Sequence, residues 1–402
     1  MSLCEDARTL QGDLVDLRHR LHREPEIGLD LPRTQETVLR ALAGLPLEVT
    51  LGRSLSSVTA VLRGYAPGPT VLLRGDMDAL PVTERTGLPY AAAADRMHAC
   101  GHDLHTTMLA GSARLLAAHT DRLAGNVVFM FQPGEEGQDG AGHMLREGVL
   151  EAAGQRPVAA YALHVTSSGL PQGMFTTRRG PILAASDTAY VTVRGAGGHG
   201  SMPHLARDPI PAACEMVLAL QTLVTRCFDV NDPVVVTVGS MHGGTQHNII
   251  PEEVRFEATV RSFSPSACAR ARDGIVRVVR GVADAHGVEA GIDYQDGYPA
   301  TVNNAAEAEF VADTVAELHG EERFTWAAHP QPGAEDFSRV LDEIPGSFVA
   351  LGATPSDADP DSAAYNHSPL AAFDDAVLCD GAALYAHLAL RRLTVEQSLP
   401  TR

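Results

Sequence analysis

A change of pattern at about Ala184 constrains the fold of this chain more than any other feature of its sequence. From this point six elements can be read in order: a strand at 187–194, a helix at 208–226, strands at 233–239 and 253–263, a helix at 264–285 and a strand at 289–294. The order βαββαβ is that of a split-βαβ unit, in which two helices cover one face of a sheet. The sequence therefore predicts a small ferredoxin-like domain at about 184–296.

The segments on either side read as two parts of one larger α/β domain, 1–183 and 297–402. Four continuous apolar runs precede the inserted domain, at 57–62, 70–73, 126–131 and 158–163, and a strand-like stretch at 347–351 follows it. Continuous runs are typical of strands that helices cover on both faces. Leucines at helical spacing predict an amphipathic opening helix: Leu10, Leu14, Leu17 and Leu21. We therefore expect an α/β fold with a mixed sheet between helices, interrupted by the inserted domain.

The composition excludes several classes of function. All 31 basic residues among the 402 are Arg, so the chain has no lysine. This excludes mechanisms that need a lysine amine. A net charge of -19 disfavours nucleic acid and anionic membranes as partners, because both require basic patches. No run approaches the roughly 18 apolar residues that cross a membrane. The six cysteines are scattered, which suits a reducing compartment. We expect a cytoplasmic protein whose partner is a small molecule.

The segment HACGHDLH, at 98–105, contains the ligand types of zinc and related divalent metals. Cys100 and His102 stand two apart around a glycine and can point the same way from a bent or extended segment. His105 could instead lie on the first turn of the helix that follows. The alternative interpretation is a helix N-terminus that is rich in histidine by coincidence.

Acids or a histidine follow three of the apolar runs. Asp76 and Asp78 follow the second run, Glu135 and Glu136 the third, and His164 the fourth. In open α/β sheets, ligands bind beyond the carboxyl ends of the strands, so these side chains predict one site. The adjacent glutamates suggest one metal ligand and one general base. Taken alone, the two glutamates could also be a solvated acidic loop.

Together these and further motifs resemble a known family over about residues 14–388. The motifs are, in chain order, GDMDALP, HACGHDLH, QPGEEG, GAGHMLREG, ALHV, GGHGSMPH, HNIIP, VRSF, GAEDFS and NHSP. They are similar to the hippurate hydrolase and indoleacetyl-amino-acid hydrolase branch, the amidohydrolase branch of the metallo-aminoacylase/carboxypeptidase superfamily. The resemblance implies the same architecture, with the ferredoxin-like domain at 184–296 acting as a lid.

The resemblance also implies a role for each matching residue. Two divalent metal ions, zinc or else manganese, cobalt or nickel, would be held by Cys100, His102, Glu136, His164 and His367. Glu135 would be the general base, and Asp78 an acid that orients the site. In the lid, His199 would help to stabilise the oxyanion, with Asn248 nearby. Arg261 would hold the substrate carboxylate, since its planar fork grips a carboxylate with two hydrogen bonds.

The function implied is hydrolysis of the amide bond of N-acyl amino acids, such as hippurate or N-acetyl conjugates, by a metal-activated water. A dipeptidase or carboxypeptidase of the same superfamily is the alternative. A third interpretation, a non-catalytic metal-binding or ligand-binding protein, has no need of Glu135 beside the ligand glutamate. The exposed sheet edge of the lid would suit a homodimer or homotetramer.

A dinucleotide-binding interpretation fails on one motif. A literal GxGxxG occurs at 195–200, directly after a predicted strand. SMPHLARDP follows where a helix should begin, and its proline interrupts that helix. The glycines are better explained as a sharp turn that carries His199.

Overall fold

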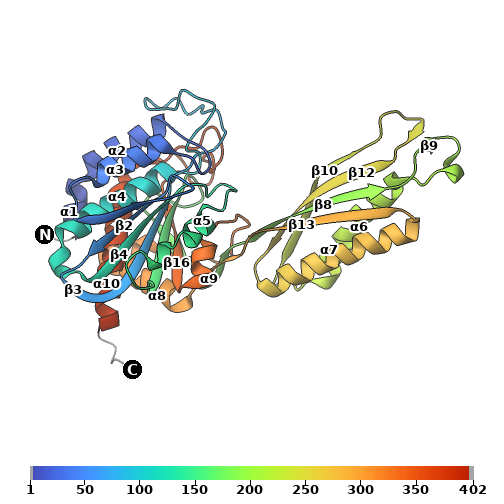
Figure 1. Ribbon diagram of the computed structural model, residues 1–402. Helices are drawn as coiled ribbons and strands as arrows, with labels where there is room; N and C mark the ends of the chain where they lie inside the picture. The colour runs from blue at the N-terminus through green and yellow to red at the C-terminus, as the bar shows by residue number, and fades with distance from the viewer. Residues whose placement is uncertain (1–2, 398–402) are drawn as a thin grey trace. The chain divides into compact units, whose positions relative to one another are not determined.

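A computed structural model of the protein describes residues 3–397, which fall into two units (Figure 1). The first unit comprises Met1–Gly180, Val302–Ala328 and Arg339–Arg402. The second comprises Pro181–Thr301 and His329–Ser338. The short strands β7 (Gly180–Leu183) and β14 (Thr301–Asn303) pair with each other where the chain passes between the units.

The first unit is built on a mixed sheet of eight strands. In spatial order they are β1 (Leu47–Leu51), β2 (Val58–Arg63), β4 (Ala124–Gln132), β3 (Ala66–Asp76), β5 (Ala159–Thr166), β16 (Gly346–Gly352), β6 (Phe175–Thr177) and β15 (Phe324–Trp326). The four neighbours β4, β3, β5 and β16 run parallel, so their carboxyl ends lie at one edge. Their residues are almost wholly buried, as the continuous apolar runs predicted.

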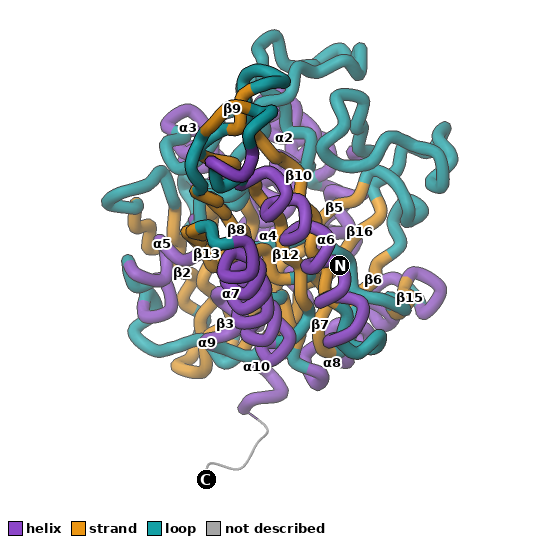
Figure 2. Tube along the Cα trace, turned by 90° about the vertical axis from the view of Figure 1, so that its right-hand side faces the viewer, coloured by secondary structure: helices purple, strands orange, loops and turns teal. Residues whose placement is uncertain are grey.

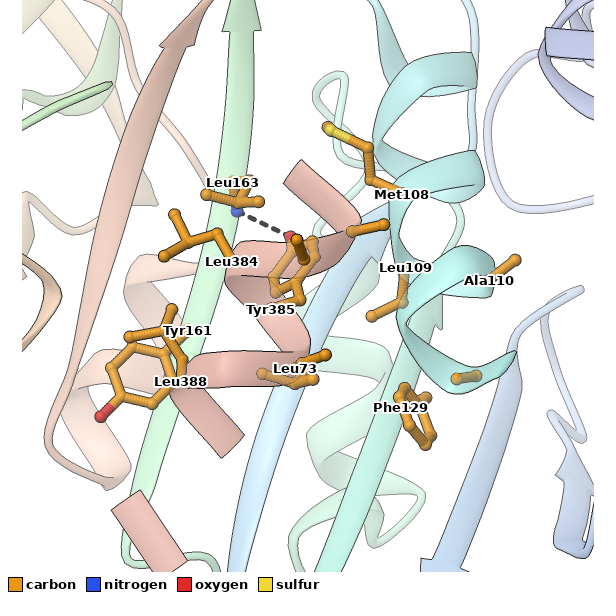
Figure 3. Packing of buried hydrophobic residues seen from close by; sticks show 14 of the residues in the cluster. Leu73, Met108, Leu109, Ala110, Phe129, Tyr161, Leu163, Leu384, Tyr385 and Leu388 are labelled. Carbon is orange, nitrogen blue, oxygen red and sulfur yellow. Dashed lines mark hydrogen bonds between the residues drawn. The ribbon is translucent and has the colours of Figure 1, made fainter. Parts of the chain in front are cut away.

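Helices α4 (His102–Ala118) and α10 (Leu378–Gln397) pack against each other and against the central strands of this sheet. Figure 3 shows Tyr385 of α10 reaching the sheet beside Leu163. Its hydroxyl accepts a hydrogen bond from the Leu163 N–H at 2.7 Å and donates one to the Arg74 carbonyl at 2.5 Å. Tyr385 therefore joins β3 and β5 near the ends that carry the candidate ligands.

The remaining helices of the chain are shorter or lie farther from the sheet centre. In the first unit they are α1 (Leu3–Thr9), α2 (Gln11–Arg23), α3 (Pro32–Leu42), α5 (Gly140–Arg146) and α8 (Ala305–His319), with α9 (Ser338–Glu343) beginning at the unit boundary. Short 3-10 turns are η1 (Thr120–Arg122), η2 (Val149–Glu151), η3 (Pro203–Leu205), η4 (Glu321–Arg323) and η5 (Asp375–Val377). Two long connections, 77–101 and 353–374, contain no helix or strand among their described residues and belong to the teal loops of Figure 2.

The second unit has an antiparallel four-stranded sheet in the order β10 (Val234–Gly243), β12 (Glu253–Ser262), β8 (Ala185–Arg194) and β13 (Glu289–Tyr298). Helices α6 (Pro209–Cys227) and α7 (Pro265–His286) pack against it on one side (Figure 1). Along β12 buried and exposed side chains alternate, with Phe256, Ala258 and Val260 buried toward the helices. The chain order is βαββαβ, as the sequence pattern indicated.

Helix α6 lies where the sequence predicted a helix, at 208–226. By length and composition alone it could cross a membrane, whereas no such run was expected. Charged and polar residues, among them Glu215 and Arg226, interrupt its apolar positions, so it contains no long continuous apolar run. Its buried residues recur every three or four positions, as in Ala212, Met216 and Leu220, and pack in the hydrophobic cluster of the second unit.

The unit boundaries differ from the predicted ones in one segment. The sequence placed all of 297–402 in the larger domain, whereas His329–Ser338 groups with the second unit. Hydrogen bonds explain the difference: the Ala184 N–H lies 3.1 Å from the Gln331 carbonyl and 2.8 Å from the Gly333 carbonyl. The Gln331 N–H in turn donates to the Ile182 carbonyl. This pairing joins a segment distant in sequence to the start of the unit.

Candidate metal centre

The parallel strands of the first unit bring the predicted ligand segments to one edge of the sheet. Asp76 is the last residue of β3 and lies opposite Gln132, the last residue of β4. Glu135 and Glu136 stand in the turn that follows β4, and His164 lies near the carboxyl end of β5. The shared strand direction therefore produces the convergence that the sequence predicted.

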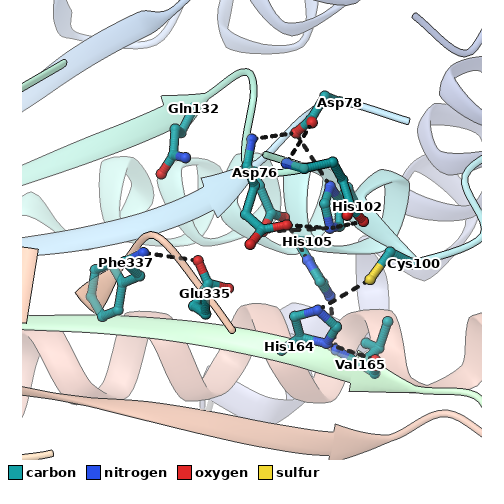
Figure 4. Close-up of polar contacts among 12 residues, drawn as sticks. Asp76, Asp78, Cys100, His102, His105, Gln132, His164, Val165, Glu335 and Phe337 are labelled. Atoms are coloured by element: carbon teal, nitrogen blue, oxygen red, sulfur yellow. Dashed lines mark hydrogen bonds and ion pairs between the residues drawn. The ribbon is translucent and has the colours of Figure 1, made fainter. Parts of the chain in front are cut away.

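Cys100 and His102 reach this edge because of the glycine between them. Gly101 has φ +83°, a left-handed conformation, and a Cβ on it would lie 2.3 Å from Cγ2 of Val165. Only glycine satisfies both conditions without strain. The turn ends the loop at Cys100 and begins α4 at His102. Cys100 thus reaches His164 near the end of β5, and His102 lies beside Asp76 and Asp78 at the end of β3 (Figure 4).

The donor atoms of the predicted ligands lie within reach of one another. The Cys100 Sγ is 3.4 Å from His164 Nε2 and 3.3 Å from His367 Nε2. The His367 Nε2 is 3.1 Å from Glu136 Oε1, which is 4.0 Å from His102 Nε2. Five groups of donors could each hold a metal ion, and three of them contain only the predicted ligands and Glu135: Cys100, His102 and His164; Cys100, Glu136 and His367; His102, Glu135 and Glu136. All five predicted ligands and Glu135 are therefore together.

The chemistry of the donors fits divalent metal ions. His102 is fully buried, and within residues 3–397 neither of its ring nitrogens makes a hydrogen bond. Buried polar atoms normally have a hydrogen-bond partner, so ring nitrogens that make none but face a thiol and carboxylates fit coordination of a metal ion. Cys, His and Glu ligands suit zinc and its first-row neighbours.

Hydrogen bonds to the second ring nitrogen separate ligand from structural histidines. The His164 Nδ1 donates to the Val165 carbonyl at 2.9 Å, which leaves Nε2 with a lone pair facing Cys100. His105 is held at both nitrogens: Nδ1 contacts Asp76 Oδ1 at 2.6 Å, and Nε2 accepts from the Val165 N–H at 2.7 Å. Both nitrogens of His105 are therefore engaged by protein groups, and His105 lies on the first turn of α4, the alternative placement that the sequence allowed.

Asp78 positions the turn that carries the two glutamates. One of its carboxylate oxygens accepts from the Glu135 N–H and the other from the Glu136 N–H, both at 3.0 Å. Its Oδ1 also lies 3.4 Å from His102 Nδ1 (Figure 4). Asp78 thus contacts both the glutamate turn and a candidate ligand, and its carboxylate is almost wholly buried.

Charged groups of the centre shift one another's protonation. Burial disfavours ionisation of Asp76, but the Arg74 guanidinium and nearby imidazoles hold the pKa of this carboxyl well below its usual range. Burial opposes protonation of His102, yet Asp76 and Cys100 raise the pKa of His102 well above its ordinary value. Burial, aided by a neighbouring imidazole, holds the pKa of His164 well below its ordinary value.

Glu136 and His367 form the more exposed side of the centre. Hydrogen bonds with Cys100 and Glu136 raise the pKa of His367 to about 10. Burial opposes ionisation of Glu136, but the hydrogen bond from His367 lowers the pKa of Glu136. Since a ligand must be deprotonated to coordinate, protons compete with metal at these positions.

The three remaining predicted residues belong to the second unit. His199 lies in β9 (Gly198–His199), which pairs with β11 (Ile249–Ile250), and the Gly200 N–H donates to the Asn248 carbonyl at 2.8 Å. His199 and Asn248 are therefore neighbours. Arg261 lies opposite Ser186, the second residue of β8. The turn that carries His199 follows the last residue of β8, so Arg261 and His199 lie toward opposite ends of that strand. The Arg261 guanidinium donates to Thr259 Oγ1 at 2.6 Å.

Sequence reasoning missed Asn366. Its side-chain amide contacts the backbone at Cys100, Val165 and Ser167. The signals in the sequence are its place directly before the candidate ligand His367 and at the start of the NHSP motif, neither of which indicates what its amide contacts. The adjacent His367 is also one of two non-glycine residues with positive φ in the described chain, at φ 72°.

The parallel strands gather Cys, His and Glu donors at their carboxyl ends, with a second glutamate beside them, an arrangement that suits a metal-dependent hydrolase. Comparison with known proteins identifies the family. The sequence pattern of Peptidase family M20/M25/M40 matches residues 72–391, and the chain belongs to this family. The superfamily that the motifs resembled is thereby confirmed.

Three relatives illustrate the match. The chain is 35% identical to thermostable carboxypeptidase 1 of Saccharolobus solfataricus, over 97% of this chain and 98% of that protein. It is also 35% identical to an IAA-amino acid hydrolase ILR1-like 5 of Arabidopsis thaliana, over 97% and 88% of the two chains. A crystal structure of a dinuclear metal-binding peptidase of the M20 family from Bacillus subtilis superposes with a TM-score of 0.82, at 29% identity over 96% and 99% of the chains.

Proposed function

We propose that the protein hydrolyses the amide bond of N-acyl amino acids, such as hippurate and N-acetyl conjugates, with two bound divalent metal ions. The observation that carries this proposal is Glu135, a second carboxylate beside Glu136 that belongs to neither of the two candidate groups containing Cys100. Its Oε2 is 3.9 Å from His102 Nε2, and its backbone is fixed by Asp78. The likeness to an IAA-amino acid hydrolase supports the substrate class.

The proposed ligands are Cys100, His102, Glu136, His164 and His367. Zinc, manganese, cobalt or nickel ions bound there would supply Lewis acidity to a water nucleophile and to the amide carbonyl. The Cys100 sulfur lies 3.4 Å from His164 Nε2 and 3.3 Å from His367 Nε2 and belongs to both candidate groups that contain these histidines, so it would be a ligand in either.

Glu135 would take the proton from the attacking water and return it to the leaving nitrogen. Asp78 would keep this carboxylate in place through the turn that it binds. In the second unit, which we propose acts as a lid, His199 would stabilise the oxyanion with Asn248 beside it. Arg261 would bind the substrate carboxylate, because a guanidinium offers it two parallel hydrogen bonds. A cytoplasmic location and a homodimer or homotetramer joined through this unit belong to the same proposal.

The test joins metal analysis with a panel of N-acetyl, N-benzoyl and indoleacetyl amino acids. We expect turnover that a chelator abolishes and added metal restores. The Glu135→Gln variant should keep its metal and lose about 10²-fold to 10⁴-fold in kcat, the usual contribution of a general base. The exposed Glu309→Gln variant is the matched control and should behave as wild type. Undiminished turnover by Glu135→Gln would reject Glu135 as the base.

A dipeptidase or carboxypeptidase is the second candidate function. The likeness to a carboxypeptidase at 35% identity favours it. Dipeptides and blocked longer peptides in the same panel separate the two candidate functions. The two enzymes would differ only in the acyl group that they accept on the scissile amide. Metal binding without turnover of any of these compounds would instead indicate the non-catalytic interpretation.

A further inference from the structure

The side-chain amide of Asn366 joins three segments that carry candidate ligands. Its Oδ1 accepts from the Ser167 N–H at 2.9 Å and from the Ser167 hydroxyl at 3.0 Å. Its Nδ2 donates to the Val165 carbonyl at 3.0 Å and to the Cys100 carbonyl at 3.2 Å. The amide therefore lies between the loop before α4 and the end of β5.

The orientation of this amide follows from its partners. A backbone N–H can only donate, so the atom facing Ser167 must be the oxygen. The carbonyls of Val165 and Cys100 can only accept, so they must face the NH₂ group. Both ends of the amide are thus used, and an isosteric acid would retain only one of them.

Each contact of Asn366 bears on a different ligand. The Val165 carbonyl is also the acceptor for His164 Nδ1, at 2.9 Å, so fixing this carbonyl fixes the His164 ring and its tautomer. The Cys100 carbonyl belongs to the residue whose thiol faces His164 and His367. Asn366 itself is bonded covalently to His367.

The backbone at His367 shows that this arrangement is enforced by its surroundings. Its φ of 72° is uncommon for a side chain with a Cβ. Such conformations persist where neighbouring contacts fix them. Here the His367 N–H donates a hydrogen bond to the Ala99 carbonyl at 2.8 Å. The preceding residue, Asn366, is fixed by the hydrogen bonds of its own side-chain amide.

We infer that Asn366 is a positioning residue of the metal centre: its amide holds Cys100, His164 and His367 in the geometry that binds metal. This inference rests on the proposed function. It requires only that the donors bind metal, whatever the substrate.

The test uses cobalt(II) as the probe, titrated into the metal-free full-length protein. Affinity and the thiolate-to-cobalt absorption band are both measured. Asn366→Asp keeps the size of the side chain and its acceptor but directs a carboxylate oxygen at the two carbonyls. We expect cobalt affinity to fall about 10-fold to 100-fold, as for other groups that orient ligands, and the absorption band to shift. Asn366→Ala removes the amide without adding charge and should also weaken binding.

Asn303→Asp is the matched control. The buried Asn303 amide bridges strands in the same way, with Nδ2 donating to the Arg178 carbonyl at 2.9 Å and Oδ1 accepting from the Phe348 N–H at 2.8 Å. It belongs to none of the candidate metal-binding groups. We expect this variant to lose thermal stability but to keep wild-type cobalt affinity and spectrum.

The outcomes separate the inference from the function on which it rests. Wild-type protein that takes up no cobalt overturns the metal-dependent function and this inference with it. Normal uptake by wild type, with affinity and band unchanged in both Asn366 variants, overturns the inference alone. An equal loss of affinity in Asn303→Asp also overturns it, because the effect would then be general destabilisation.

Discussion

The histidines at 98, 102 and 105 lie within eight residues, and their surroundings give them different chemistry. His102 has bare nitrogens among carboxylates, whereas both nitrogens of His105 are engaged by Asp76 and the Val165 N–H. Burial lowers the pKa of His98 to about 3, so this ring is neutral at physiological pH. Of the three histidines in this motif, one is therefore a candidate ligand and two are structural.

The thiol of Cys268 in the second unit leads to a prediction at the scale of one residue. Its Sγ donates to the buried Asp187 carboxylate at 3.1 Å. Burial, together with this carboxylate, raises the pKa of Cys268 to about 11. The thiolate is the reactive form of cysteine, and a pKa raised by about two units lowers the thiolate fraction about 100-fold. Alkylation of Cys268 at pH 8 should therefore be about 100-fold slower than that of an ordinary thiol.

Iodoacetamide labelling followed by peptide mass spectrometry measures these rates. The exposed Cys214 and Cys227 should be modified first in the folded protein. In urea all three should react alike, which serves as the control. The same raised pKa favours the folded state below pH 9, and this contribution is lost as pH rises toward 11. Labelling of Cys268 as fast as Cys214 in the folded protein would contradict the prediction.

At the scale of elements, a buried ion pair attaches α2 to the beginning of α4. The Arg18 Nε donates to Asp103 Oδ2 at 2.8 Å, and both side chains are fully buried. His22, one turn later on α2, contacts the same oxygen at 2.8 Å. Because Asp103 directly follows His102, this pair also supports the turn that carries a candidate ligand.

Arg18→Met should therefore be strongly destabilising. Removing one partner leaves a buried charge uncompensated, which typically costs about 3–5 kcal/mol of the free energy of unfolding. Urea denaturation measures the change. Arg20→Met, at an exposed position of the same helix, should change stability little. A comparable loss in both variants would show that the ion pair is not the cause.

The elements also show what the sequence could and could not predict. Long apolar runs identified the central strands β2 to β5, because strands covered on both faces need no alternation. The three-residue strands β6 and β15 were missed, since so short a segment has no periodicity. The donors could be predicted because they follow the carboxyl ends of strands. Neighbouring parallel strands end at the same edge of the sheet, which is also why the donors converge. Asn366 could not be predicted, because its contacts come from segments about 200 and 266 residues away.

At the scale of the whole molecule, all the proposed ligands belong to the first unit. In the second unit, the two edge strands of the sheet differ in the exposed side chains that they carry. Strand β13 carries exposed acids along its edge, including Glu289 and Asp293. Strand β10, which pairs only with β12 among the described strands, exposes Val235 and Met241, and Leu218 of the nearby α6 is 69% exposed. Charges protect a sheet edge against association, so β10 is the unprotected edge.

We therefore expect a homodimer in which a second copy covers β10 and α6. Leu218→Arg should dissociate this dimer, because the interface would then contain two positive charges, one from each copy. Sedimentation velocity measures the state. Asp293→Arg, at the opposite edge, should leave it unchanged. A monomeric wild type, or a dimer unaffected by Leu218→Arg, would exclude this interface.

The division of the second unit into two chain segments has a consequence for engineering. A gene fragment that encodes only 181–301 would lack His329–Ser338, and with it the carbonyls of Gln331 and Gly333 that pair with Ala184. The same excision would remove Phe337, whose side chain is fully buried. A chimera that exchanges this unit between relatives must therefore transplant both segments, which in the chain are separated only by the short stretch 302–328 of the first unit.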